Sequence, residues 1–148
     1  MNSLAQLHLD YGKAYHAFQQ KLDPRLRLPT LSNSYLIFPL GVSGAHFAAG
    51  LLVKDQRLQF YLLLQGKNCE TWFESLLNDK TEIESVLCEK PVWSPRRKSN
   101  RTRVTVYFSV ADFDDRHDWL RQHNWILLQA TRFQEAFHQR LHGLKGTP

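Results

Sequence analysis

The side chains best able to recognise a ligand form a cluster of cations in the second half of the chain. Five positive charges fall within eight residues, with no Asp or Glu between them: Arg96, Arg97, Lys98, Arg101 and Arg103. Such a cluster is the electrostatic footprint of a site that binds a phosphate backbone. It also suits a solvated hairpin whose charges protect a sheet edge from pairing with other chains. Both interpretations stay open, although edge protection needs fewer charges than these.

Trp93 stands shortly before this cluster and gives it an aromatic neighbour. An exposed indole beside arginines can stack on a nucleic-acid base. Packing in the core is the commoner role, and it is the role expected for the other three tryptophans, Trp72, Trp119 and Trp125. The candidate nucleic-acid site therefore consists of the five cations together with Trp93.

A metal-dependent nuclease of the restriction type would need an Asp and an Asp/Glu-x-Lys sequence on adjacent strands. The nearest approximation is Asp55 followed by Gln65-Gly66-Lys67. Asp55 lies in the turn before an expected strand, whereas Gln65 follows the far end of that strand. At about 3.3 Å per residue, the two are about 30 Å apart and cannot share a metal ion.

Other reactive side chains are better explained by structure than by chemistry. His138 and His142 have the spacing of a metal-ligand pair on an expected helix, but no carboxylate or cysteine supports them there. Cys69 stands near the start of a helix, where a thiolate is favoured, but no base can be assigned to it. The sequence therefore predicts no catalytic residue, no metal site and no cofactor.

Two further motifs invite a ligand and are given structural roles instead. The segment Gly41-Val42-Ser43-Gly44 could cradle a phosphate, but it lacks the Lys-Ser/Thr of a P-loop and suits a tight turn between strands. A cluster of four aspartates lacks the regular alternation of a calcium loop, and helix capping accounts for the cluster. Its members are Asp112, Asp114, Asp115 and Asp118.

Hydrophobic periodicity predicts the elements that position these residues. Apolar side chains recur at three- and four-residue intervals in helices expected over residues 4–22, 68–87 and 112–142. Alternating or continuous apolar runs predict strands over residues 35–40, 45–53, 58–64, 92–93 and 104–110. The strand over residues 58–64 is apolar on both faces, so we expect it at the centre of the sheet. The basic segment 95–100 joins the last two strands as a hairpin.

This order predicts one α+β domain over residues 1–148, with an antiparallel sheet of about five strands packed by three helices in the order α-βββ-α-ββ-α. The length of 148 residues and the 43% of hydrophobic residues are enough for one core. No run of about eighteen apolar residues indicates a membrane span, and the N-terminus lacks the pattern of a secretory signal. Two cysteines are too few for a disulfide scaffold, so we expect a cytoplasmic protein.

The net charge of +5 is unevenly placed, because thirteen basic residues face fourteen acidic ones outside residues 90–111.

Several short sequence motifs occur in a recognisable order along the chain. They are the pair Tyr15 and Phe18, the segment Phe38 to Gly44, the run Lys80-Thr81-Glu82-Ile83-Glu84, Trp93 followed by Arg101 and Arg103, Asp118-Trp119, and the run from Arg132 to Phe137. Through them the chain resembles the bacterial domain-of-unknown-function family 4268. In that family the domain often follows a nuclease-like domain, and we expect this chain, which begins at Met1, to be the accessory part alone.

The resemblance implies a setting of DNA processing or defence against foreign DNA, by association alone. Our first hypothesis is a non-catalytic accessory module that binds DNA or RNA through the basic hairpin, with a nuclease-type protein partner acting in trans. Our second is a protein-interaction or dimerisation module, with a homodimer formed through Pro39 to Gly44 or through the last helix. A third, an enzyme with a site assembled from dispersed histidines and acids, has no motif to support it.

Overall fold

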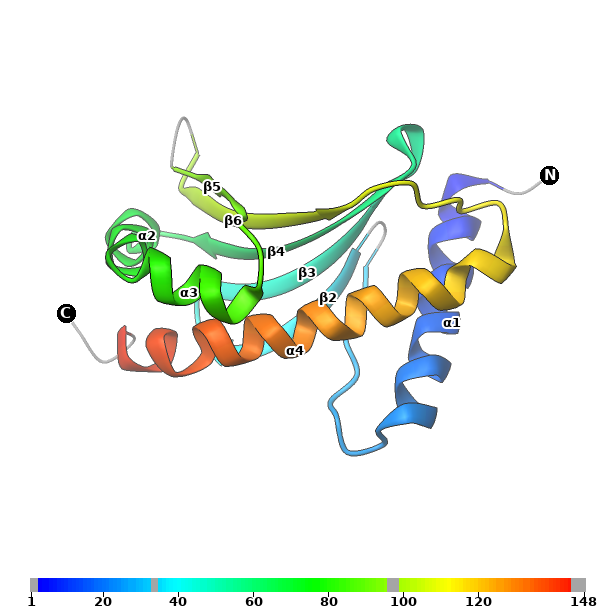
Figure 1. The fold of residues 1–148 in the computed structure, drawn as a ribbon, viewed down its shortest axis with the longest axis horizontal. Helices are drawn as coiled ribbons and strands as arrows, with labels where there is room; N and C mark the ends of the chain where they lie inside the picture. The colour runs from blue at the N-terminus through cyan, green and yellow to red at the C-terminus, as the bar shows by residue number, and fades with distance from the viewer. Residues whose placement is uncertain (1–2, 33–34, 96–98, 145–148) are drawn as a thin grey trace.

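The chain folds around an antiparallel sheet, seen in a computed structural model that describes residues 3–32, 35–95 and 99–144 (Figure 1). The strands stand in the order β1-β2-β3-β4-β6-β5. Their bounds are Thr30–Leu31 (β1), Tyr35–Val42 (β2), Ala45–Leu52 (β3), Arg57–Gln65 (β4), Val92–Ser94 (β5) and Arg101–Phe108 (β6). The expected α+β class is confirmed, and so are the central position of residues 58–64 and the hairpin that joins the last two strands.

The helices pack against one face of the sheet. They are α1 (Leu4–Leu22), α2 (Cys69–Asn78), α3 (Lys80–Leu87) and α4 (Trp119–Leu144). Helix α4 runs along the sheet, α2 and α3 lie near its C-terminal end, and α1 crosses its N-terminal half (Figure 1). No helix in the described part of the chain has the length and apolarity that a membrane span requires.

The structure differs from the expected elements in three places. Residues 68–87 form two helices rather than one, because the chain makes a tight turn at Asp79, whose backbone N–H donates to the carbonyl oxygen of Leu76 at 3.0 Å. Helix α4 begins at Trp119 rather than near residue 112, since the side chains of Asp115 and Asp118 bind backbone N–H groups in the preceding turn. The two-residue strand β1 was expected to be loop, and it is too short to show a periodicity.

The core lies between α4 and the helix-covered face of the sheet. Phe133 packs edge-on against Phe60, with the ring centroids 4.8 Å apart, and against Phe47 at 5.7 Å. Phe137 also reaches Phe47, at 6.4 Å. All four rings are almost completely buried. Burying each one contributes about 1.5–3 kcal/mol, so this contact fixes α4 across the strands.

Polar side chains join α1 to α4 inside the crossing of the two helices. The hydroxyl of Tyr11 donates to Oε1 of Gln122 at 2.9 Å, and Nε2 of Gln122 donates to the carboxylate of Asp118 at 2.8 Å. Arg121 also donates to that carboxylate, at 2.7 Å. These hydrogen bonds, that of Arg121 first, hold the pKa of Asp118 well below its usual range. Both helices are thereby tied to one carboxylate.

His123 lies at the same crossing, surrounded by aromatic rings. Its ring centroid is between 4.8 and 6.2 Å from those of Tyr11, Tyr15, Phe18 and Trp119. Only 4% of the residue is exposed, and its Nε2 has no hydrogen-bond partner among the described residues. Burial lowers the pKa of His123 to about 4, so the ring is neutral in the folded protein.

This burial predicts a loss of stability on mild acidification. The unfolded chain takes up a proton on His123 near pH 6.5, whereas the folded protein does so only near pH 4. The unfolded state therefore gains protons first, and we expect the free energy of unfolding to fall by about 2 kcal/mol between pH 7 and pH 4.5 through this residue. Urea unfolding at the two pH values measures the change.

His123→Leu keeps an apolar side chain in the aromatic surroundings and removes the titration, so it should flatten the pH dependence by that amount. The matched control is His117→Leu, at an exposed histidine in the turn before α4. An unchanged pH dependence in His123→Leu would contradict the assignment.

Candidate nucleic-acid interface

The face of the sheet that carries no described helix is built from alternate residues of β2 to β6. Cross-strand pairing places one row of side chains across the full width of this face: Ser94, Arg103, Leu63, His46 and Pro39. The neighbouring row points into the core instead and consists of Trp93, Val104, Leu62, Phe47 and Phe38. Because successive side chains point to opposite faces of a strand, the sheet separates a cationic surface from an apolar one.

Arginines lie over tyrosine rings on this helix-free face. The Cζ atom of Arg103 is 4.5 Å from the centroid of Tyr61, and that of Arg57 is 4.7 Å from the centroid of Tyr107. Tyr35 meets Tyr61 edge-on, with the centroids 6.4 Å apart. Each cation–π contact is worth about 0.5–1 kcal/mol at an exposed site. The contacts hold two guanidinium groups above the strands.

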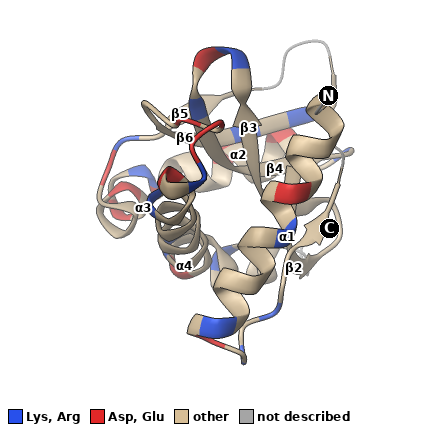
Figure 2. Ribbon diagram, turned by 90° about the vertical axis from the view of Figure 1, so that its right-hand side faces the viewer, with Lys and Arg blue, Asp and Glu red and all other residues tan. Residues whose placement is uncertain are grey.

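Carboxylates are absent from the strands of the described structure. No residue of β1 to β6 is Asp or Glu, and every acidic residue lies in a helix or a connecting segment (Figure 2). Within the described part of the chain, Arg101 and Arg103 have no ion-pair partner. Burial lowers the pKa of His46, and the charges of Arg103 and Arg101 lower it further. The helix-free face therefore carries uncompensated positive charge.

A hollow of about 460 Å³ adjoins the arginines at the base of the basic hairpin. It is lined by Val92, Trp93, Ser94, Pro95, Ser99, Arg101 and Arg103. Two guanidinium groups and two hydroxyl groups thus surround a space without a carboxylate. Guanidinium groups bind phosphate oxygens through two parallel hydrogen bonds, which a phosphate group in this hollow would satisfy.

The structure brings together three of the six predicted site residues, because Trp93, Arg101 and Arg103 line the same hollow. Arg101 and Arg103 share the helix-free face, whereas Arg96, Arg97 and Lys98 lie outside the described residues. Trp93 also packs into the core: its Nε1 donates to Glu84 at 3.1 Å, and its ring packs edge-on against Phe73. Core packing, the alternative considered for Trp93, is observed, and stacking on a base stays a prediction.

The other candidate chemistry is placed as follows. Asp55 lies in the short 3₁₀ turn before β4, and Gln65 is the last residue of that strand, which agrees with their expected positions. The rings of His138 and His142 are in contact, with centroids 4.2 Å apart, and Nε2 of His142 lies 3.1 Å from the carbonyl oxygen of Leu40. Within residues 3–32, 35–95 and 99–144, no group of three or more His, Cys, Asp or Glu side chains could hold a metal ion.

Sequence reasoning missed the part of the site that comes from β3 and β4. His46 and Arg57 are isolated polar residues within apolar strands, and neither belongs to a motif. A signal was present, because Arg57, Tyr61, Arg103 and Tyr107 occupy alternate positions that place them all on one face once β4 pairs with β6.

Comparisons with known proteins identify a family without an assigned activity. Residues 11–141 match the model of a domain of unknown function, DUF4268. No curated protein matches the chain. Among solved structures, the chain is similar to the crystal structure of YbjN from E. coli, which is described as a candidate transcription regulator. The two share 14% sequence identity and a TM-score of 0.43, over 88% of this chain and 93% of the other.

The electrostatics of the face can be measured at His46. We expect Arg103→Gln to raise the pKa of His46, because it removes a neighbouring positive charge, and Arg101→Gln to raise it by less. The pKa is read from an NMR titration of the His46 ring protons. Arg57→Gln, which removes an arginine that does not shift the pKa of His46, should leave it unchanged. No rise in Arg103→Gln, or an equal rise in Arg57→Gln, would refute a local field at this point.

Proposed function

We propose that this chain, which belongs to the DUF4268 family of domains of unknown function, binds nucleic acid through the helix-free face of its sheet. The observation that carries the proposal is the pair Arg101 and Arg103, held without a carboxylate partner in the described structure. Two unpaired guanidinium groups beside an open hollow suit the phosphates of a polynucleotide.

The basic hairpin would extend this contact along the backbone of the ligand. Arg96, Arg97 and Lys98 follow Pro95 directly in the sequence, and Pro95 and Ser99 both line the hollow. The segment that carries these three cations therefore begins and ends next to residues that line the hollow. Each phosphate that they neutralise releases counterions, so affinity should depend strongly on salt concentration.

Exposed rings on the same face could hold bases. Tyr35 and Tyr107 are each 38% exposed, whereas Tyr61 is only 3% exposed beneath Arg103. Base–aromatic stacking is tolerant of sequence and contributes about 1–3 kcal/mol per base. We infer that arginines position the backbone and that the two exposed tyrosines contact unpaired bases. No residue is assigned to catalysis, so the proposed role is that of an accessory module in DNA processing, with any nuclease chemistry supplied by a partner.

The rival function is a protein–protein interface on the same face. Val92 is 50% exposed at the edge strand, and with Tyr35 and Tyr107 it adds apolar surface beside the arginines. A homodimer formed through this face would bury those residues and would be insensitive to added nucleic acid. The two functions therefore differ in what the arginines contact and in how salt acts.

Fluorescence anisotropy with single-stranded DNA, RNA and duplex DNA across a salt series tests the proposal. We expect binding that weakens steeply with salt, and we expect Arg101→Gln/Arg103→Gln to weaken it about tenfold or more at low salt and to reduce the salt slope by about two. Arg96→Ala/Arg97→Ala/Lys98→Ala should act in the same direction. Tighter binding of single strands than of duplex DNA would support stacking of unpaired bases on the exposed tyrosines.

The matched control is Lys13→Gln/Lys21→Gln, which removes the same number of charges from the exposed side of α1. It should preserve most of the affinity, because α1 lies on the other side of the sheet. Absence of binding at low salt, or equal losses in the two double variants, would contradict a site on the helix-free face. A dimer detected by sedimentation and dissociated by Arg101→Gln/Arg103→Gln, without nucleic-acid binding, would support the rival.

A further inference from the structure

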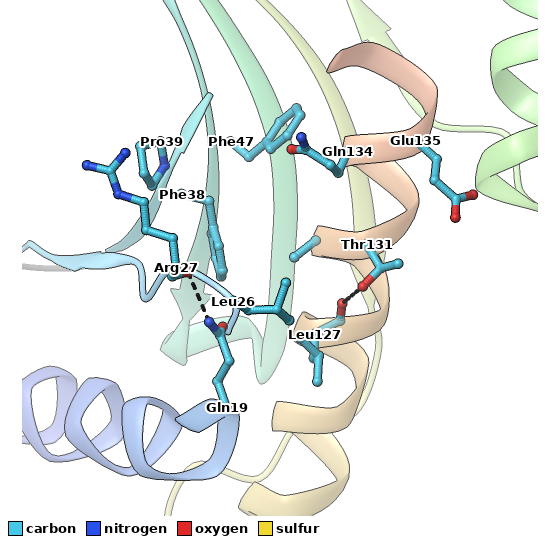
Figure 3. A pocket seen from close by; sticks show the side chains of 11 residues that line it. Gln19, Leu26, Arg27, Phe38, Pro39, Phe47, Leu127, Thr131, Gln134 and Glu135 are labelled. Carbon is cyan, nitrogen blue, oxygen red and sulfur yellow. Dashed lines mark hydrogen bonds between the residues drawn. The ribbon is translucent and has the colours of Figure 1, made fainter. Parts of the chain in front are cut away.

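A cavity of about 350 Å³ opens on the helical side of the sheet, away from the arginine face. It lies between the C-terminal part of α1, the connection from α1 to β1, the first strands and the middle of α4 (Figure 3). Helix α1 crosses α4 rather than running beside it (Figure 1). The inner face of the sheet contributes Phe38 and Phe47 to the lining of the cavity.

The walls of the cavity are largely apolar. The rings of Phe38 and Phe47 come from neighbouring strands, and Leu127 and Ala130 come from one side of α4. Leu26 closes the cavity from the connection and points toward Leu127 in Figure 3, although 43% of it is exposed. Cavities of this size and lining, with a few polar groups at the rim, are typical of sites for small molecules.

Side chains of α1 hold the connection in place over the cavity. Nε2 of Gln19 donates to the carbonyl oxygen of Arg27 at 3.0 Å, while Oε1 of Gln19 accepts from the hydroxyl of Tyr15 at 2.7 Å. The ring of His16 contacts the carbonyl oxygen of Pro29 at 2.6 Å. The amide of Gln19 is therefore satisfied within the protein.

The rim of the cavity is positively charged on the side of the connection. Residues 21–27 carry Lys21, Arg25 and Arg27 against a single acid, Asp23. The guanidinium of Arg27 lies beside Pro39 at the outer rim and has no ion-pair partner among the described residues. On the opposite side, Gln134 points into the cavity, whereas the carboxylate of Glu135 points away from it (Figure 3).

We propose that this cavity binds an amphipathic carboxylate of medium chain length. The alkyl chain lies against Phe38, Phe47 and Ala130, and its burial supplies most of the affinity, at about 0.8 kcal/mol for each methylene group. The carboxylate lies at the rim on the side of the connection, where Arg27 can donate hydrogen bonds to it. This site is separate from the proposed nucleic-acid interface and does not depend on it.

Decanoate, used below its micellar concentration, is a suitable probe. We expect the methyl resonances of Leu26, Leu127 and Ala130 to shift on its addition, and calorimetry to give its affinity. Ala130→Phe should abolish binding by filling the cavity. Arg27→Gln should weaken it about fivefold, the upper end of the effect of an exposed ion pair. Decyltrimethylammonium, which has the same alkyl chain with a cationic head, should bind more weakly than decanoate.

Arg25→Gln is the matched control, because it removes an equal charge from the same connection outside the lining of the cavity. If Ala130→Phe fails to fold, as judged by circular dichroism, Gln134→Trp at the exposed rim replaces it. The proposal is overturned if decanoate causes no shift of these methyl groups up to about 1 mM. It is also overturned if Arg25→Gln and Arg27→Gln weaken binding equally, or if neither cavity-filling variant weakens it.

Discussion

The contact of Phe133 with Phe60 and Phe47 is the interaction on which the arrangement of this protein depends. It places the long helix α4 across one face of the sheet and leaves the other face without a described helix. A single layer of helices can bury only one side of a sheet, so the other side must be stabilised by its own side chains. The strands meet that requirement with Arg103 over Tyr61 and Arg57 over Tyr107.

Those arginine–tyrosine contacts explain how a surface can be both ordered and charged. The arginine stems cover apolar atoms, while the guanidinium groups keep donors for an external ligand. Tyr61, Leu63 and Ala48 form a small buried cluster beneath them, distinct from the main core. This apolar cluster with cations above it is stable without a ligand, because the guanidinium groups stay hydrated. The same guanidinium groups can still bind an anion. This is the physical basis for assigning recognition to the helix-free face.

Much of the fold follows from local sequence signals. The bounds of α1, the central strand β4 and the hairpin between β5 and β6 could be predicted, because capping residues, continuous apolar runs and turns act over short distances. The late start of α4 could not, since it depends on how the Asp118 side chain binds the backbone of Asp112. The burial of His123 was hidden for a similar reason: three of its four aromatic neighbours come from α1, more than 100 residues earlier in the chain.

The candidate site was predictable to the same extent. Clustering in sequence revealed Arg101 and Arg103, but the face that they occupy depends on strand register. Register also directs the ring of Trp93 onto Phe73, although Trp93 still borders the hollow of the arginines. The alternation of successive side chains between the two faces of the sheet also affects β2 and β3. Phe38 and Phe47 line the cavity beside α4, while His46, the neighbour of Phe47, lies on the opposite face. Pro39, which pairs with His46, borders the cavity at its rim. The arginines that we assign to phosphates are on β6, outside the cavity lining. A substitution of these arginines therefore leaves the cavity lining unaltered, and the sheet lies between the two proposed sites.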